Sequence, residues 1–492
     1  MQVVSGRVGQ LRRRLADEDP VRWALATMVV VWSTTFIYLG WMRHARFSTY
    51  GFDLGIYDQG VWLLSQLEDP FVTVRGLELF GHHVNPILVA IAPFYRLGGG
   101  PELLLVVQVL AQASGAVAVY LLARDRLGGR WLGVAMAGVL LLNPTYQFLA
   151  WEFFHPDALA MAPLLFAYWA ARAHRWPWFW VGAVLAMSCK EDAALAVLVL
   201  GVLVFIRGHR RIGGLAALLA LVWYLVATRV VIPAVTGMAP FYEALFPQFG
   251  NSGLDAAKGA ILYPGTTVRV ALGEDRLTYL RMMLLPFGML PFFALPTFSI
   301  AAPMLAVNLL NVLSFTRDYR FHYSALVVSA GILATVEAIA WLGHTPRARR
   351  GLVALTLLAA LGSSVAWGAS PISTKFRGAG IWVLEDDDAQ GVREKALGLI
   401  PKGAAVSAAY QFVPHLTHRQ RIYEFPVPWR PTNWGVDGEG LHDPALVQWV
   451  LVDRSALGPE DASIFNQLVE REFEIQYSQA GFTVARRVRP AG

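Results

Sequence analysis

The stretch FDLGIYDQGVW at 52–62 places two carboxylates, Asp53 and Asp58, directly after an apolar run long enough to cross a membrane. A partly desolvated carboxylate at a membrane edge is a better proton acceptor than one in water, as general-base catalysis requires. At this spacing on a helix, the two side chains would point about 140° apart and would not share a face. We therefore expect one to act as a base and the other to cap a helix or pair with Arg43 or Arg46. The plainer alternative is that both are loop acids that cap a surface helix.

Two adjacent histidines, His82 and His83, occur in the loop-like stretch GHHVNP at 81–86. Neighbours in an extended segment point to opposite faces, so at most one imidazole is expected in a given site. A metal site built on His83 would need further ligands, for which Asp53 and His155 are the candidates. The alternative is a polar loop near the lipid headgroups.

Charged side chains also gather at two other places where apolar runs end. They are Glu152, His155 and Asp157 in WEFFHPD, and Lys190, Glu191 and Asp192 in CKED. Glu152 and His155 are three residues apart and would face together on one helical turn. The CKED stretch leaves almost no loop between its two apolar runs, and ionisable groups so placed cost free energy unless they are paired or line a wet cavity. They are therefore functional candidates, with a solvated hairpin turn as the alternative.

The stretch FTRDYRFHYS at 315–324 combines arginines with aromatic residues and a histidine. Guanidinium groups bind phosphate in a bidentate manner. Arg317 and Arg320, together with Lys190, are therefore candidate phosphate ligands, and His322 is a candidate polar contact nearby. The alternative is that these side chains only hold the chain at the membrane interface.

Transmembrane helices must position these residues. The chain has 492 residues, 55% of them hydrophobic and only 15% charged, against about 25% charged in a soluble domain. Its apolar runs are continuous rather than alternating, which predicts spanning helices and argues against a barrel. We predict about eleven spans, at 21–41, 101–123, 131–149, 158–172, 176–189, 193–206, 212–232, 282–296, 298–315, 323–342 and 351–368.

Short arginine-rich connections alternate with connections that carry the histidines and acids. The positive-inside rule makes the arginine-rich side cytoplasmic, with the N-terminus inside and the C-terminus outside. The net charge of +6 is then explained by topology rather than by nucleic-acid binding. The arginines concerned are Arg12 to Arg14, Arg124, Arg126, Arg130, Arg172, Arg175, Arg207, Arg210, Arg211, Arg347, Arg349 and Arg350.

Three regions follow from this pattern. They are a basic cytoplasmic N-terminus at 1–20, a transmembrane domain at 21–369 with outer loops 42–100 and 233–280, and a small extracytoplasmic α/β domain at 370–492. The first apolar run lacks a cleavage site and is interpreted as a retained anchor. The single cysteine, Cys189, excludes an intrachain disulfide. In the last region, strands are predicted at 404–410, 421–428 and 447–453, with a hairpin around Gly481.

Four phrases taken together resemble a known family. The series FDLGIYDQGVWLLS, FGHHVNPILVAIAPFYRL, LLNPTYQFLAWEFFHPDALAM and MSCKEDAAL is similar to the DUF2079 family of bacterial and archaeal predicted membrane proteins, as is AAVSAAYQFVPHLTHRQRIYEFP in the tail. More broadly, the layout resembles the GT-C membrane glycosyltransferases, which carry a catalytic acid in the first outer loop and use polyprenyl-phosphate sugars. This resemblance implies Asp53 as the acid, with Asp58 as its competitor, and leaves a divalent metal (Mg²⁺ or Mn²⁺) open. A second acidic region would be Glu152 or Asp157, or Glu191 or Asp192.

The sequence thus predicts an inverting glycosyltransferase on the outer face of a bacterial or archaeal cytoplasmic membrane. The donor would be a polyprenyl-phosphate-linked sugar, and the acceptor an envelope glycan, lipid or protein. Asp53 would take the proton from the acceptor hydroxyl, while His83, His155 and Glu191 would orient sugar hydroxyls or hold a metal. Direct displacement needs no Ser or Cys nucleophile, and HExxH, GxSxG and Walker A motifs are absent. The alternatives are a transporter or flippase of lipid-linked sugars and a non-catalytic envelope assembly factor.

Overall fold

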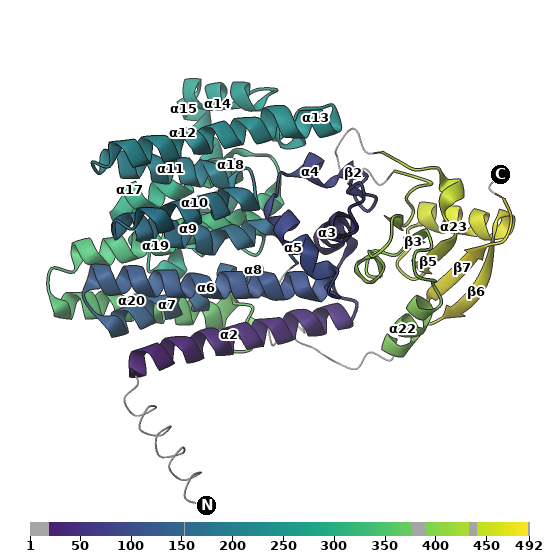
Figure 1. The fold of residues 1–492 in the computed structure, drawn as a ribbon, viewed down its shortest axis with the longest axis horizontal. Coiled ribbons are helices and arrows are strands. Elements are labelled where there is room, and N and C mark those ends of the chain that lie inside the picture. The colour runs from purple at the N-terminus through teal and green to yellow at the C-terminus, as the bar shows by residue number, and fades with distance from the viewer. Residues whose placement is uncertain (1–18, 152, 376–388, 432–439, 491–492) are drawn as a thin grey trace, which may run out of the picture.

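An elongated bundle of helices carries a small β-sheet domain at one end (Figure 1). The computed structural model describes residues 19–151, 153–375, 389–431 and 440–490. Among the residues that the sequence singles out, Arg12 to Arg14 and Glu152 lie outside these ranges.

Long apolar helices make up the bundle. Among the described residues, six helices are long and apolar enough to cross a membrane, or seven if α7 and α8, bent by 57°, form one span. The apolar helices α10 and α11 are shorter, with 14 residues each. The chain is therefore a multi-pass helical membrane protein, as the sequence predicts. The helices are α2 (Pro20–Ala45), α6 (Pro101–Leu127), α7 (Arg130–Leu142), α8 (Pro144–Trp151), α9 (Pro156–Arg172), α10 (Trp176–Cys189), α11 (Ala193–Ile206), α12 (Arg210–Val226), η2 (Ala227–Val231), α13 (Ile232–Thr236), α19 (Ala325–Leu342) and α20 (Pro346–Trp367).

Local chemistry fixes where several of these helices begin. Proline is the first residue of α2, α6, α8, α9 and α20, a position where its missing N–H costs nothing and its fixed φ suits the first turn. Asp19 and Thr345 cap α2 and α20 by accepting hydrogen bonds from the backbone N–H groups of Val21 and Ala348. The predicted starts of α2, α6 and α9 lie within two residues of the observed ones, whereas that of α20 is five residues late.

The predicted spans 282–296 and 298–315 are confirmed only in part: Leu290–Leu310 is one of the six candidate spans, but short helical pieces make up this region instead of two continuous helices. Four prolines interrupt it, and a proline inside a helix breaks the hydrogen-bond ladder. The chain runs from Tyr279 to Thr297 and back to Asn308. The side-chain amide of Asn308 donates a hydrogen bond to the Tyr279 hydroxyl at 2.9 Å. Its two ends are therefore side by side. The pieces are α16 (Glu274–Leu284), η4 (Leu285–Phe287), η5 (Leu290–Ala294), α17 (Leu295–Phe298), η6 (Ser299–Ala301) and α18 (Ala302–Leu310).

Short elements connect several of the spans. Before α6 they are η1 (Gly51–Gly55), α3 (Ile56–Gln66), β1 (Phe71–Val72), β2 (Leu77–Glu78), α4 (Leu79–His82) and α5 (Ile87–Tyr95). Between α13 and α19 they include η3 (Phe241–Leu245), α14 (Gly253–Leu262), α15 (Pro264–Ala271), η7 (Ser314–Arg317) and η8 (His322–Ser324).

A five-stranded mixed sheet forms the C-terminal domain. Its order is β4-β3-β5-β7-β6, with β3 parallel to both β4 and β5 and the other pairs antiparallel. The β6–β7 hairpin turns at Ala480 and Gly481, which have φ values of 48° and 86°, as a tight two-residue turn requires. All the predicted strands are present. They are β3 (Val406–Ala408), β4 (Ile422–Glu424), β5 (Trp449–Asp453), β6 (Phe473–Gln479) and β7 (Phe482–Arg487), with helices α22 (Gln390–Gly398), η9 (Val413–His415), η10 (Pro444–Leu446) and α23 (Pro459–Arg471).

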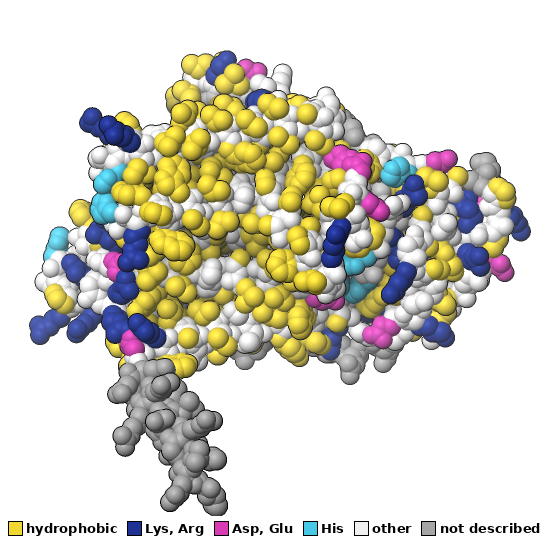
Figure 2. Space-filling view, viewed as in Figure 1, with side chains coloured by type: hydrophobic (Ala, Val, Ile, Leu, Met, Phe, Trp, Pro, Cys, Tyr) yellow, Lys and Arg dark blue, Asp and Glu magenta, His cyan; other side chains and the backbone are white. Residues whose placement is uncertain are grey.

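The two ends of the bundle differ in chemistry. Figure 2 shows hydrophobic side chains over the middle of the visible face, and arginines and lysines gathered at the end away from the sheet domain. We call that end, with the connections 124–130, 172–176, 206–210 and 342–350, the basic end. The opposite end, with η1, α4, η8 and the connections 153–156 and 189–193, is the polar end.

Candidate functional site

Polar side chains from five separate segments converge at the polar end. Tyr57 on α3 lies among them and is itself buried. Burial raises the pKa of its hydroxyl well above the usual value, Lys190 opposes this shift, and the charges of Asp157, Asp53 and Glu191 add to it. Charged groups that are far apart in the chain, from Asp53 to Glu191, therefore lie close enough to Tyr57 to change its pKa. The segments are η1, the connection after α4, the residues before α9, the connection between α10 and α11, and η8.

Asp53 has the most unusual backbone in this cluster. Its φ is 69° and its ψ is −87°, a conformation that costs a non-glycine residue on the order of 1 to 3 kcal/mol and recurs at functional sites. The side chain is 22% exposed, and its Oδ2 lies 3.2 Å from Nε2 of His155. Asp53 is therefore a carboxylate that is held in place by a histidine and is still reachable from outside.

His155 is fixed from three directions. Its backbone N–H donates to Oε1 of Gln108 at 2.6 Å. Its ring stacks on that of His322 with centroids 3.6 Å apart, and Tyr57 meets it edge-on at 6.0 Å. This immobilised imidazole can set the direction of the Asp53 carboxylate.

Lys190 sits between two carboxylates. Its Nζ lies 3.0 Å from Asp157 and 3.2 Å from Asp192, and its side chain is only 4% exposed. A buried ammonium is tolerated in a membrane protein when it is paired in this way. The charged connection thus joins the start of α9 to the α10–α11 turn.

Three donors converge on the buried carboxylate of Glu191. They are Nδ1 of His83 at 2.7 Å, the backbone N–H of Val84 at 3.0 Å and the hydroxyl of Tyr242 at 3.2 Å. Burial lowers the pKa of His83 well below its usual value, and the charge of Lys190 adds to this effect. A lowered pKa favours the neutral imidazole, and the short contact between Nδ1 and Oε1 holds this ring against Glu191.

His82 and His83 do not point to opposite sides as expected. Their ring centroids are 4.4 Å apart. His82 ends the helix α4, whereas His83 has extended backbone angles of −144° and 149°. Strand alternation therefore does not apply to the pair.

Asp58 lies apart from Asp53 and contacts the C-terminal domain. It is fully buried, accepts a hydrogen bond from the Tyr95 hydroxyl at 2.5 Å and another from the Thr417 hydroxyl, and lies 3.3 Å from Nε2 of His418. Its partner is this histidine rather than Arg43 or Arg46. The contacts favour a structural role for Asp58 in docking the sheet domain.

The backbone of η1 also touches the C-terminal domain. The N–H of Gly51 donates to the carbonyl of Tyr410 at 3.0 Å. A Cβ at Gly51 would lie 3.0 Å from the side chain of Val413, and one at Gly55 would lie 3.2 Å from it. Glycine suits both positions because the two segments approach so closely that a side chain would press against Val413. We call the contacts of residues 51–58 with residues 410–418 the latch.

Asp58→Ala is expected to loosen the latch by about 1 to 3 kcal/mol, because buried hydroxyl donors lose a charged acceptor. Hydrogen exchange of residues 410–418 in the full chain should then speed up, with a smaller effect for Asp58→Asn. Burial lowers the pKa of His418, but the hydrogen bond and charge of Asp58 outweigh this and raise it overall. In the wild type, protection is therefore greatest below about pH 6.5 and falls as the pH rises through the raised value. Unchanged exchange in Asp58→Ala would contradict the docking role.

The two candidate arginines of the 315–324 stretch have different surroundings. Arg317 is 6% exposed, and its guanidinium binds Asp275 at 2.7 Å and the carbonyls of Asn311 and Leu313 at 3.0 Å each. Arg320 is 45% exposed and paired with Asp318 at 2.6 Å. The contacts of Arg317 favour a structural role, whereas Arg320 is reachable.

Sequence reasoning missed several members of the cluster. Gln108 gave a detectable signal, since an amide in an apolar span needs a partner inside the protein. Tyr57 and Tyr242 gave no signal, because tyrosines are common at membrane interfaces.

One group could hold a metal ion among the described residues. His155, Asp157 and His322 each offer a donor atom, and these atoms lie within 4.8 Å of one another. Two imidazoles and a carboxylate suit a transition ion such as Mn²⁺ better than Mg²⁺, which prefers oxygen ligands. The group includes His155 of the expected ligands, but neither Asp53 nor His83. A cation here would share Asp157 with Lys190.

Comparison with known proteins gives a family and a fold. The family model described as predicted membrane protein (DUF2079) matches residues 43–485. No curated protein matches the sequence.

Solved structures resemble the chain over almost its full length. ArnT from Cupriavidus metallidurans in the apo state has a TM-score of 0.55 at 15% identity, covering 95% of this chain and 98% of ArnT. ArnT bound to undecaprenyl phosphate has a TM-score of 0.53 at 13% identity, covering 94% and 98%. The apo oligosaccharyltransferase of Archaeoglobus fulgidus has a TM-score of 0.43 at 14% identity, covering 94% and 74%. At such identities the ArnT match establishes the fold, which is ArnT-like over almost the full length of the chain.

Proposed function

Because the chain belongs to the DUF2079 family of predicted membrane proteins and has an ArnT-like fold, we propose that it is an inverting membrane glycosyltransferase. It would transfer a sugar from a polyprenyl-phosphate donor to an envelope glycan, lipid or protein at the polar end, which the arginine distribution makes the extracytoplasmic side. The observation that carries the proposal is Asp53: a reachable carboxylate in a left-handed backbone, held 3.2 Å from His155.

Asp53 is the base in the proposed reaction. It takes the proton from the acceptor hydroxyl while that oxygen forms a bond to the anomeric carbon. The bond between the anomeric carbon and the donor phosphate breaks, and polyprenyl phosphate leaves with the bonding electrons. His155 positions the carboxylate through Nε2. A single displacement inverts the anomeric centre and needs no covalent enzyme intermediate.

The leaving phosphate needs a cation near the cluster. Arg320 suits this role better than Arg317 or Lys190, because its side chain is 45% exposed, whereas those of Arg317 and Lys190 are 6% and 4% exposed. Lys190 is already bound by Asp157 and Asp192, so it would attract the phosphate by its positive charge at a distance and not by direct contact. If His155, Asp157 and His322 hold a divalent ion such as Mn²⁺, its chemistry there is neutralisation of charge on the departing phosphate.

Aromatic side chains beside Asp53 offer a surface for a sugar. Tyr50 lies 5.2 Å from Phe153 and 5.0 Å from Tyr410, ring centre to ring centre. Tyr410 is 41% exposed and belongs to the C-terminal domain. The apolar face of a sugar ring packs well on such rings, so we place the acceptor between the two domains.

The ArnT likeness suggests the lipid carrier by analogy of fold. The purified full chain is expected to retain undecaprenyl phosphate at least tenfold better than undecaprenol in native mass spectrometry, because only the former carries the anion. Arg320→Gln should reduce this preference about tenfold, the worth of one charged hydrogen bond, whereas the exposed Arg269→Gln should keep it. Equal retention of the two lipids would contradict a phosphate-recognising site.

A transporter of lipid-linked sugars is the second candidate. It is favoured by a polar cluster at the basic end, where Arg126 and Arg172 bind Glu337 at 2.8 and 3.0 Å, because a translocation path needs polar groups at both ends. Proteoliposomes with lipid-linked sugar separate the two functions. Release of polyprenyl phosphate supports transfer, and movement of the intact lipid supports transport.

A further inference from the structure

A pocket lies at the basic end, away from the candidate active site. It has a volume of about 330 Å³ and is lined by Ala171, Arg172, His174, Trp176, Val204, Arg207 and His209. Two helix connections form its walls, one from α9 to α10 and the other from α11 to α12. Both turn sharply: His174 has a φ of 54° and Gly208 a φ of 99°.

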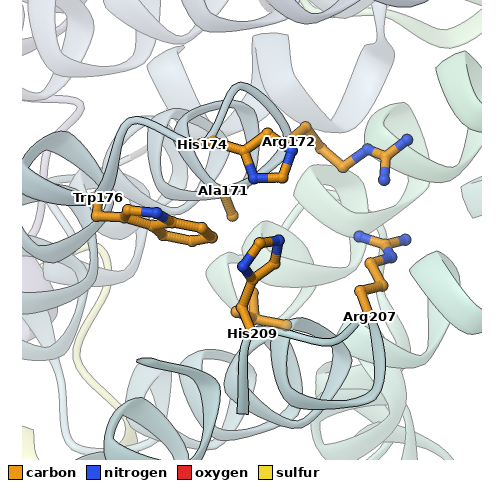
Figure 3. A pocket seen from close by; sticks show the side chains of 7 residues that line it. Ala171, Arg172, His174, Trp176, Arg207 and His209 are labelled. Carbon is orange, nitrogen blue, oxygen red and sulfur yellow. The ribbon is translucent and has the colours of Figure 1, made fainter. Parts of the chain in front are cut away.

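The pocket pairs cations with an aromatic wall (Figure 3). The guanidinium groups of Arg172 and Arg207 lie on one side of it and the indole of Trp176 on the other, with two imidazoles between them. The centroid of the His209 ring is 4.7 Å from that of His174 and 4.6 Å from that of Trp176. Such a set of donors matches an anion with several oxygens.

Positive charge exceeds negative charge around this pocket. Arg126 and Arg172 share the single carboxylate of Glu337. Arg207 donates to the hydroxyls of Tyr168 at 3.3 Å and Thr297 at 3.5 Å, and no carboxylate of the described residues pairs with it within 4.0 Å. Of the two guanidinium groups that line the pocket, that of Arg172 shares its carboxylate with Arg126, so positive charge is in excess and an anion can be accommodated.

The surroundings indicate where the anion comes from. Ile206 is 72% exposed, Phe205 45% and Trp178 61%, and all three flank the pocket on apolar helices. Apolar side chains that stay exposed on a membrane protein face lipid, and basic pockets between helices at this depth bind anionic lipid headgroups.

We propose that the pocket formed by Arg172, His174, Trp176, Arg207 and His209 binds the phosphate group of an anionic phospholipid. The phosphate lies between the two guanidinium groups, and the acyl chains run along Phe205 and Ile206. Lipid binding at this pocket does not depend on the proposed sugar transfer, so an experiment can contradict one proposal and leave the other standing.

Lipid-dependent thermal protection of the purified full chain tests the site, with phosphatidylglycerol and phosphatidylcholine as probes. The concentration of phosphatidylglycerol that protects the wild type should be at least tenfold lower than that of phosphatidylcholine. In Arg207→Gln the concentration needed should rise about 10- to 100-fold, as expected for loss of a bidentate contact to a charged group. The exposed Arg211→Gln makes the same charge change on the neighbouring α12 and should behave as the wild type.

Two further arms keep the test decisive. If Arg207→Gln does not fold, Arg207→Lys retains a cation but loses the bidentate geometry, and should show an intermediate loss. Protection by millimolar inorganic phosphate without any preference among lipids would keep the phosphate chemistry and overturn the lipid as its source. Equal protection of Arg207→Gln and Arg211→Gln by phosphatidylglycerol would overturn the site itself.

Discussion

Asp53→Asn is expected to lower the rate of sugar transfer by about 10²- to 10⁴-fold, because general-base catalysis contributes that much. An amide keeps the size of the side chain and can still form a hydrogen bond with His155. It cannot take the proton from the hydroxyl of the acceptor substrate. The Michaelis constant for the donor should change little, since Asp53 acts on the acceptor. Single-turnover assays with the purified chain and its lipid-linked sugar measure this rate.

Two companion variants sharpen the Asp53 test. Glu470→Gln removes an exposed carboxylate from the C-terminal domain and should leave transfer unchanged. His155→Gln should lower the rate less than Asp53→Asn and should shift its pH dependence, as expected of a positioning residue. Transfer at the wild-type rate by a folded Asp53→Asn protein would remove Asp53 from the mechanism.

Lys190→Met is expected to destabilise the fold by about 3 to 5 kcal/mol, because it leaves two carboxylates in the protein interior without their cation. The side chain of Lys190 is 4% exposed, that of Asp157 6% and that of Asp192 23%. Thermal unfolding of the detergent-solubilised chain measures the loss. Combining Lys190→Met with Asp157→Asn should recover part of it, since one buried charge is removed.

Arg320→Met is the matched control for Lys190→Met, because it removes a cation whose side chain is 45% exposed, against 4% for Lys190. Its cost should stay below about 1 kcal/mol, as for other exposed ion pairs. If Lys190→Met unfolded at the wild-type temperature and lost only lipid phosphate binding, Lys190 would be a ligand of the donor rather than part of the scaffold.

Local chemistry made much of the fold predictable. Prolines and caps such as Asp19 and Thr345 define helix starts, and the apolar runs between them are long enough to span a membrane. The strands of the C-terminal domain were predicted from short apolar runs and from the turn at Gly481. The stretch 282–315 was harder, because its prolines break the helix while its composition remains apolar.

The sequence predicted which residues form the site better than it predicted the hydrogen bonds and ion pairs between them. Asp53, His155 and Lys190 were named from the sequence, yet their partners depend on how separate helices pack. Asp58 and Thr417 are 359 positions apart, and no local pattern connects them. Glu337 was missed because a single acid inside the apolar run 323–342 hardly changes its character, although two arginines pair with it.

The latch has a mechanical consequence for Asp53. Gly51 is hydrogen-bonded to Tyr410, and Asp58 is bonded to Thr417, so Asp53 lies on a short loop clamped at both ends by the same stretch of the sheet domain. A displacement of residues 410–418 should therefore move the Asp53 carboxylate, because the backbone at Gly51 packs closely against Val413. Whatever binds the sheet domain is thereby coupled to the orientation of the Asp53 carboxylate.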